Sequence, residues 1–278
     1  MKGLDASWAL PGSLGGVAHP FALLWKYRRL LAQTVSVDIK VRFVGSLLGL
    51  SWVVLYPLIL LAAYAFVYIF VFRIRVEGIA SIDYVLFLMS GLIPFLGFSE
   101  ALQASITSIT GNASLLRNSL FPIEMIPVKV ILAGQVKQVV SMLLLLLAAA
   151  VAGHWSWATL LVVPFWAAQL CLLLGMGWVL AATNTYIRDI QNVSGLLTLF
   201  LMLASPIAYS VDMVPSELQT FVWLNPLTYL IVPWQDVVVR GVLPDVFTIT
   251  MLCLQSLFVF VGGFWFFARL RNVLVDYV

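Results

Sequence analysis

Six long apolar stretches constrain the fold of this chain more than any other feature of its sequence. A helix that crosses a bilayer needs about 20 predominantly apolar residues, so each stretch is long enough to cross once. Only 10% of the 278 residues are charged, whereas about 25% are charged in soluble domains, whose surface must meet water. The sequence therefore predicts an all-α integral membrane protein with six transmembrane helices. Their predicted ranges are 47–72, 84–109, 127–152, 158–182, 192–211 and 246–268.

The residues before the first stretch divide into a leader and an interfacial region. Residues 1–19 contain Gly and Pro and lack the features of a signal peptide, so we expect a flexible leader. Residues 20–45 begin with an amphipathic pattern, which is typical of a helix on the cytoplasmic membrane surface. Its apolar face carries Leu23, Leu24, Tyr27, Leu30 and Leu31. Residues 46–278 then form the transmembrane domain.

Residues 35–43 alternate between apolar and polar side chains, and this pattern alone predicts a β-strand. A lone strand beside a membrane would leave its backbone groups unpaired. A helix instead stacks valines on one face and brings Asp38 beside Arg42. We therefore predict a second short interfacial helix in this region.

The segment between the fifth and sixth stretches is apolar but interrupted. Four prolines divide it into pieces too short to span a bilayer: Pro206, Pro215, Pro226 and Pro233. Irregular backbone at membrane depth persists only where protein buries it or where it lines a cavity. We therefore expect short re-entrant helices that enter from the outer face.

The basic residues set the predicted orientation, because cytoplasmic loops of membrane proteins are enriched in Lys and Arg. With the amino terminus inside, 11 of the 15 basic residues fall on the cytoplasmic side. These are Lys2, Lys26, Arg28, Arg29, Lys40, Arg42, Arg117, Lys129, Arg188, Arg269 and Arg271. We therefore expect a multi-pass protein of the bacterial inner membrane with both termini in the cytoplasm.

The sequence contains none of the common catalytic or nucleotide-binding signatures. It has no Gly-Lys dipeptide and hence no Walker-type phosphate loop, so any ATP and Mg²⁺ must bind to a separate protein. It has no HExxH, CxxC or GxSxG motif, and Cys171 and Cys253 have no partner at ligand spacing. We therefore expect no catalytic residue, metal site or cofactor in this chain.

Two charges of opposite sign fall inside the apolar stretches, Glu100 in the second and Lys137 in the third. A charge at a helix centre costs about 2.5–3.5 kcal/mol on insertion scales, so such residues need a partner. Their predicted depths match, and we expect an ion pair with hydrogen-bond support from Gln103 and Gln138. The pair either clamps the bundle or forms part of a polar path through it.

Aromatic residues are dense in the first stretch. They are Trp52, Tyr56, Tyr64, Phe66, Tyr68, Phe70 and Phe72. Such residues anchor helices at membrane interfaces or pack in cores, but their faces also offer sugars a stacking surface with little hydrogen-bond specificity. On the second interpretation Tyr56, Tyr64, Phe66 and Tyr68 line a channel.

Residues 112–129 form a cytoplasmic loop with an apolar cluster beside Arg117. The cluster comprises Leu115, Leu116, Leu120 and Phe121. An apolar group that faces the cytoplasm should be covered. Either it folds back on its own bundle or it inserts into a groove on a partner ATPase.

Several short motifs in this sequence occur in the same order as in one family of membrane proteins. The run RFVGSLLGLSWVVLYPL, residues 42–58, contains Arg, Gly-Ser, Leu-Gly, Trp and Pro at the family's spacings. The later matches are Asn112, Leu116, Phe121, Pro122, Pro127, Tyr186, Arg188, Asp189, Ser205, Pro206, Ile207, Tyr209, Pro215, Asn225 and Pro226. From about residue 26 to the end, the chain resembles the ABC-2 type permeases that export O-antigen, capsule or teichoic acid, most closely the O-antigen permeases.

The resemblance implies a transport subunit rather than an enzyme. Two copies would form a channel within membrane lipids and would bind two copies of an ABC nucleotide-binding subunit, which hydrolyses ATP. The substrate would be a polysaccharide on a polyprenyl pyrophosphate or similar lipid anchor, moved from cytoplasm to periplasm. No nucleic-acid partner is implied.

The resemblance also implies roles for particular residues. The cytoplasmic gate, where cations meet the anchor phosphates, would comprise Asp38, Arg42, Ser46, Gly49 and Trp52. The ATPase coupling contact would comprise Leu115, Leu116, Arg117, Phe121 and Pro122, with Arg188 and Asp189 in a second cytoplasmic loop. The outer gate would comprise Ser205, Pro206, Tyr209, Asn225 and Pro226.

Three alternatives remain open at this stage. One is an ABC-2 permease for a small drug or lipid, whose outer segment would be shorter or replaced by a soluble domain. Another is a membrane enzyme acting on a lipid-linked sugar, which would need acidic or His residues that converge near a membrane surface. The last is a proton-coupled transporter that uses Glu100, whose transport would persist without an ATPase.

Overall fold

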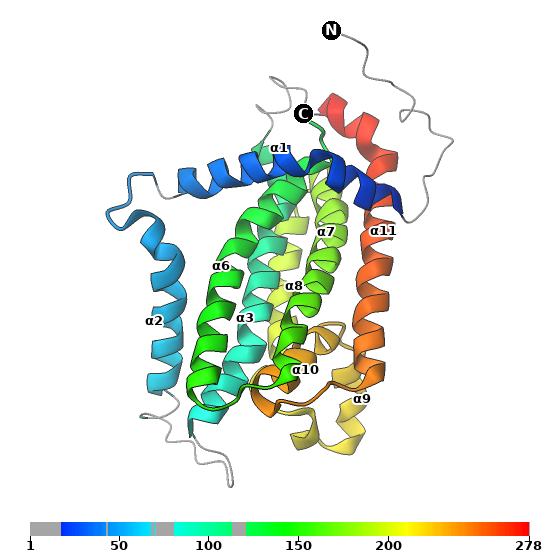
Figure 1. The fold of residues 1–278 in the computed structure, drawn as a ribbon. Helices are drawn as coiled ribbons and strands as arrows, with labels where there is room; N and C mark the ends of the chain where they lie inside the picture. Colours follow the sequence, from blue (N-terminus) through cyan, green and yellow to red (C-terminus); the bar gives the residue numbers. More distant parts are fainter. Residues whose placement is uncertain (1–17, 43, 68–69, 71–80, 113–120, 278) are drawn as a thin grey trace.

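The computed structural model describes residues 18–42, 44–67, 70, 81–112 and 121–277. The regular elements in this part of the chain are all helices, which confirms the predicted all-α class. The long helices run roughly side by side as a bundle, with one helix lying across one end (Figure 1). We call that end the α1 end, and the opposite end, which carries several short helices including α9, the α9 end.

Helix α1 (Ala18–Arg42) crosses one end of the bundle as a single element of 25 residues. The helical interpretation of residues 35–43 is therefore confirmed as far as residue 42, and the predicted division into two short helices is wrong. No Gly or Pro occurs between residues 21 and 42, so nothing interrupts the backbone hydrogen bonds of the helix.

Five helical segments are long and apolar enough to cross a membrane among the described residues. The first is Gly49–Phe66, made of η2 (Gly49–Ser51) and α2 (Trp52–Phe66). The others are Ile82–Ile106 in α3 (Ser81–Ile106), α6 (Met125–Val151), Trp157–Tyr186 in η4 (Trp157–Leu161) and α7 (Val162–Tyr186), and Val246–Arg271 in α11 (Val246–Tyr277).

The predicted fifth span corresponds to α8 (Ile190–Ala204), which is apolar but only 15 residues long. Its helix ends at Ser205, whose backbone is extended with φ −87° and ψ 145°. A residue before a proline avoids helical geometry, and Pro206 follows here. The predicted helix over 192–211 therefore ends seven residues early, with Ala204 as its last helical residue.

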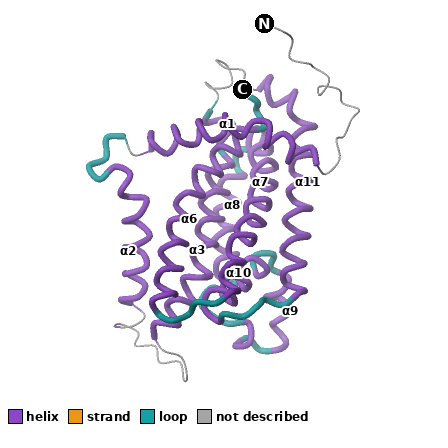
Figure 2. Tube along the Cα trace, in the orientation of Figure 1, coloured by secondary structure: helices purple, strands orange, loops and turns teal. Residues whose placement is uncertain are grey.

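Four short helical segments follow α8 at the α9 end, namely η5 (Val211–Met213), α9 (Ser216–Leu224), α10 (Thr228–Gln235) and the π-helical η6 (Asp236–Arg240). Figure 2 shows this segment, with α9 and α10 joined by a loop, beside the ends of the long helices. Pro215 and Pro226 lie outside helices, as expected for helix breakers. Pro233 instead lies inside α10, and the helix continues directly into η6.

The core is formed by α3, α6, α7 and the parts of α10 and α11 that face them. Of the span in α3, 78% is buried, whereas only 6% of the Gly49–Phe66 span is buried. Helix α2 lies at the side of the bundle and packs mainly against α6 (Figure 1). The bundle therefore consists of a packed centre and one weakly attached wall.

Helices α7 and α11 pack so closely that two glycines meet. A Cβ atom added at Gly263 would overlap the backbone of Gly175, and one added at Gly175 would overlap the backbone of Val259. Small residues allow such close backbone approach between membrane helices. The adjacent Gly262 faces open space, where an added Cβ has no neighbour within 4 Å.

This arrangement predicts opposite results for two neighbouring substitutions in α11. Gly263→Ala should lower the free energy of unfolding by about 1–3 kcal/mol, because α7 and α11 must separate. Gly262→Ala, the matched control, should leave stability unchanged or raise it slightly, since Ala is the better helix former. Thermal unfolding of the purified protein in detergent measures both, and an equal melting temperature for the two variants would contradict the packing described.

Candidate functional site

An ion pair joins α3 and α6 inside the spans. Lys137 Nζ lies 2.7 Å from Glu100 Oε1 and 3.0 Å from Oε2. The pair is not sealed in the core, because the Lys137 and Glu100 side chains are 32% and 44% exposed. Exposed charges at this depth are unfavourable in hydrocarbon, so the surface around them must face water or another protein.

Tyr56 of α2 contacts the same ion pair. The Lys137 ammonium lies 3.6 Å from the centroid of the Tyr56 ring. Such a cation–π contact is favourable at about 0.5–1 kcal/mol when exposed and more when water is excluded. This contact attaches the side wall α2 to the packed centre.

The expected hydrogen-bond support from Gln103 and Gln138 is wrong. Gln103 Nε2 donates to Thr198 Oγ1 of α8 at 3.2 Å. Gln138 is buried and exchanges hydrogen bonds with Gln169 of α7. Because Gln138 lies one residue beyond Lys137 on α6, it points to a different side of that helix.

Together these contacts define one polar face on the bundle. We use the term polar face for Tyr56, Glu100, Gln103, Lys137 and Thr198, which come from α2, α3, α6 and α8. Glu100 and Gln103 lie three residues apart and so share a side of α3. The face therefore lies where α3 and α6 are flanked by α2 and α8, the two least covered apolar helices.

The other aromatic residues of α2 are placed in different surroundings. Phe66 is exposed, and its ring lies 5.7 Å from that of Phe70. Tyr64 is half-buried and packs against the core, and Trp52 is exposed. Tyr68 lies outside the described residues. Helix α2 thus leaves several aromatic rings available on its surface.

At the α1 end, a charged cluster joins α1 to α6. Lys129 Nζ lies 3.2 Å from Asp38 Oδ2 and donates to Asn112 Oδ1 at 3.0 Å. Lys129 is buried, so this pair is partly shielded from solvent. Asp38 was expected beside Arg42, whose side chain lies outside the described part. Lys129 is 91 positions from Asp38 in the chain, and helical spacing could not reveal this pair.

The turn between α1 and α2 contains two glycines in the left-handed region, Gly45 with φ 80° and Gly49 with φ 52°. Only glycine adopts this conformation at low cost. Ser46 is exposed in the same turn. The predicted gate residues Ser46 and Gly49 thus belong to the connection that sets the direction of α2 relative to α1.

A second ion pair at the α1 end joins the start of α6 to α11. Arg271 Nη1 lies 3.2 Å from Glu124 Oε1, and Trp178 Nε1 of α7 donates to the Glu124 backbone oxygen at 2.9 Å. Glu124 is buried, and sequence reasoning overlooked both it and Arg271 as partners. The signal available was a lone acidic residue among apolar neighbours.

The structure describes only two of the five predicted coupling residues, Phe121 and Pro122. Leu115, Leu116 and Arg117 lie outside the described residues. Phe121 is buried in the core of the chain and Pro122 is half-buried. For Phe121 the fold-back alternative is therefore correct, because it packs with the core beside Ile123 rather than facing outward.

Arg188 and Asp189 occupy the connection between α7 and α8, and both are exposed. The Asp189 backbone oxygen accepts from the amides of Asn192 and Val193 and so begins α8. This connection lies at the α1 end, where α7 finishes (Figure 1). Its two charges are available to a partner on that side.

At the α9 end, hydrogen bonds fold the segment after α8 onto the short helices. Asn225 Nδ2 donates to Ser205 Oγ at 2.9 Å, and Asn225 Oδ1 accepts from the Leu227 amide at 3.0 Å. Gln235 Nε2 donates to the backbone oxygen of Pro206 at 2.9 Å. These bonds bring together the predicted Ser205, Pro206 and Asn225. Gln235 is a position that sequence reasoning missed.

The two other predicted outer residues differ in their surroundings. Tyr209 donates its hydroxyl to the backbone oxygen of Ala204 at 3.0 Å, and burial raises the pKa of this phenol above its usual value. Pro226 is exposed, and its backbone oxygen accepts from Gln255 of α11 at 3.1 Å. Tyr209 therefore holds the end of α8, and Pro226 connects the outer segment to α11.

Arg240 links Ser210, in the segment after α8, to η6 beside a small cavity. Its Nη1 lies 3.1 Å from Asp236 Oδ1, and its Nη2 donates to Ser210 Oγ at 2.9 Å. Burial raises the pKa of the Asp236 carboxyl, and the Arg240 guanidinium opposes that shift. The cavity has a volume of about 180 Å³ and is lined by Asp212, Gln235 and Arg240 among others.

Metal ligation finds no support in the described part of the chain, where His, Cys, Asp and Glu never gather in groups of three or more that could hold an ion. The nearest approach is a pair, His154 Nε2 and Asp83 Oδ1, 2.7 Å apart at the α9 end. This pair joins the α6–α7 connection to the start of α3.

Comparison with known proteins places this geometry in a family context. Residues 34–237 match the family model described as ABC-2 type transporter. The chain is 30% identical over 226 residues to the O-antigen export system permease protein RfbA of Myxococcus xanthus, covering 80% of this chain and 85% of that one. It is 26% identical over 247 residues to RfbA of Klebsiella pneumoniae, covering 87% and 92%. It is also 26% identical over 227 residues to the polysialic acid transport protein KpsM of Escherichia coli, covering 79% and 85%.

The ion pair on the polar face predicts a double-mutant cycle with a measurable coupling energy. Glu100→Lys or Lys137→Glu alone places two like charges side by side at membrane depth, so each should destabilise the protein. The exchanged pair Glu100→Lys with Lys137→Glu should regain part of the loss, with a coupling of about 0.5–3 kcal/mol. Recovery should be incomplete, because the Tyr56 contact with a cation at position 137 is lost. Thermal unfolding measures the cycle, and an exchanged variant no better than the single variants would argue against the pair.

The outer hydrogen bonds predict a local effect at Asn225. Asn225→Ala removes the acceptor of the Leu227 amide, and an unsatisfied buried amide costs about 1–3 kcal/mol. Hydrogen exchange of the segment from Leu227 to Gln235 should accelerate, while α3 and α7 stay protected. Asn192→Ala, at an exposed position of α8, is the control and should leave the pattern unchanged. If exchange rates of the outer segment were the same in both variants, Asn225 would not hold it.

Proposed function

This chain belongs to the ABC-2 type transporter family, and from that premise we propose that it is the transmembrane subunit of an ATP-driven polysaccharide exporter. The substrate is a glycan on a polyprenyl pyrophosphate or similar lipid, moved from the cytoplasm to the periplasm. The relatives named as O-antigen export permeases and as a polysialic acid transport protein support this substrate class.

The observation that carries the proposal is the exposed polar face at membrane depth. A polymer longer than the bilayer cannot be enclosed in one step, so it needs a continuous path whose lining binds it weakly. Glu100, Gln103 and Lys137 offer polar groups along such a path, and the Tyr56 ring offers a stacking surface. A bundle that faced only lipid would gain nothing from exposed charges there.

A second copy of the chain completes the path. The α2 wall is almost uncovered, and α8 exposes large apolar side chains, including Leu196 at 71% and Phe200 at 70%. The polar face lies between these two helices, so a homodimer that covers it encloses the charges in a water-filled channel between two subunits. The weak attachment of α2 allows the channel to widen without unpacking the centre.

Two copies of a separate ABC ATPase bind at the α1 end and drive the conformational change of the bundle from there. The chain has no Gly-Lys dipeptide with which to form a phosphate loop of its own. The segment before α6 and the exposed Arg188 and Asp189 are the contact points for the partner. A displacement of the start of α6 moves α1 through the Lys129–Asp38 pair. It moves α11 through the Glu124–Arg271 pair.

The proposal includes a gate at each end of the bundle. On the cytoplasmic side, the turn with Ser46 and Gly49 and the neighbouring Asp38, Arg42 and Trp52 control entry of the lipid anchor, whose phosphates pair with cations. On the outer side, the segment around Ser205 and Asn225 and the short helices α9 and α10 form a re-entrant plug that opens for the glycan. In this orientation the α1 end and both termini face the cytoplasm of a bacterial inner membrane.

Reconstitution with the partner ATPase in lipid vesicles tests the proposal. Lipid-linked polysaccharide presented on one side should become accessible to a glycosidase on the other side only when ATP is added. The control complex carries an ATPase whose phosphate-loop lysine is replaced, and its signal should fall to the background of empty vesicles. Export by the isolated subunit, or ATP-driven movement restricted to short lipids without a glycan, would refute the proposal.

A further inference from the structure

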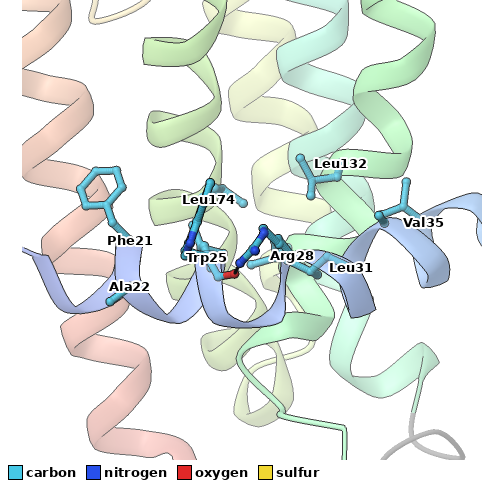
Figure 3. A pocket seen from close by; sticks show the side chains of 11 residues that line it. Phe21, Ala22, Trp25, Arg28, Leu31, Val35, Leu132 and Leu174 are labelled. Atoms are coloured by element: carbon cyan, nitrogen blue, oxygen red, sulfur yellow. Dashed lines mark hydrogen bonds between the residues drawn. The ribbon is translucent and has the colours of Figure 1, made fainter.

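An open groove lies along α1 where this helix crosses α6 and α7. It has a volume of about 940 Å³, within the range of small-molecule sites of about 300–1,000 Å³. Figure 3 shows α1 side chains on one side of the groove, with Leu132 of α6 and Leu174 of α7 opposite. The groove therefore extends from the crossing helix onto the surface of two candidate spans.

The walls of this groove are apolar apart from a single charged residue. Of the 11 residues that line it, Arg28 is the only one that carries a charge. Its guanidinium lies 4.3 Å from the centroid of the Trp25 ring, and its Nη1 donates to the Trp25 backbone oxygen at 2.8 Å. These contacts hold the cation at the groove and leave the remaining N–H donors of the guanidinium free for a ligand.

The charge of α1 around the groove is entirely positive. From Ala18 to Val37 the helix carries Lys26, Arg28 and Arg29 and no acidic residue. The first acidic residue, Asp38, is paired with Lys129. The region therefore complements an anion, and the apolar walls below it complement hydrocarbon.

We propose that this groove binds one anionic phospholipid of the surrounding bilayer. Its phosphate pairs with Arg28, and an acyl chain lies along Leu132 and Leu174. Trp25 is 70% exposed at the same level, as expected for an indole between headgroups and hydrocarbon. The lipid fills the space between α1, the first turns of α6 and the middle of α7.

The proposed lipid has a mechanical role that the Asp38–Lys129 pair alone does not provide. That pair joins α1 to α6 towards the C-terminal end of α1. At its start, α1 contacts α11 through Phe21 and Phe260, whose ring centroids lie 4.6 Å apart. The groove runs along α1 from Phe21 to Val35, so a bound lipid adds contacts to the part of the helix that Leu31 packs against the core.

Native mass spectrometry of the purified full-length chain, with added phosphatidylglycerol or phosphatidylcholine, tests this site. Phosphatidylglycerol should remain bound to the wild type, and Arg28→Gln should reduce its affinity at least about tenfold, since a charge-assisted phosphate contact is lost. Leu132→Trp, which fills the groove and keeps Arg28, should reduce it similarly. The control Arg29→Gln removes a neighbouring charge that does not line the groove, so it should weaken binding much less than Arg28→Gln does.

Each other outcome would overturn the proposal. Equal retention of the two lipids would show a groove without headgroup selectivity, and unchanged binding in Arg28→Gln would place the anion elsewhere. Displacement of the lipid by inorganic phosphate alone would indicate a simple anion site. These results are independent of export, because the measurement needs neither ATPase nor glycan.

Discussion

Polar groups at membrane depth must find partners within the protein, and this requirement organises the centre of the bundle. Gln169 donates to the backbone oxygen of Pro94 in α3, and Gln135 donates to that of Gly97. Gln138 bonds to Gln169, and its side chain occupies space that any Cβ at position 97 would fill. In hydrocarbon an unsatisfied polar group costs several kcal/mol, so these bonds fix α3, α6 and α7 relative to one another.

The polar face contrasts with these buried, hydrogen-bonded glutamines. Glu100 and Lys137 are paired but remain partly exposed, and the Tyr56 ring from the weakly packed α2 covers the cation. A rigid centre beside a loosely attached wall suits a channel whose width changes while its framework stays intact. The ion pairs at the α1 end join the start of α6 to α1 and α11, so movement of that start reaches both helices.

The sequence predicted those features that depend on local pattern. Apolar length identified the long helices, and Glu100 with Lys137 could be paired because both lie at similar depths in neighbouring helices. Long-range partners could not be predicted, because nothing local connects Asp38 to Lys129 or Glu124 to Arg271. Pro206 was recognised as a helix breaker, yet the predicted helix extended past it. The sequence stays apolar beyond Pro206, whereas the helical backbone ends before it.

The central claim is that the polar face lines a water-filled path, and thiol labelling tests it most directly. In a chain with Cys171 and Cys253 replaced, Gln103→Cys should react with a membrane-impermeant maleimide in the assembled complex, because Gln103 lies on the polar face. Leu143→Cys, at an exposed apolar position of α6 outside the polar face, should stay unreactive. Labelling of Gln103→Cys at the level of Leu143→Cys, during ATP turnover as well as at rest, would contradict the account.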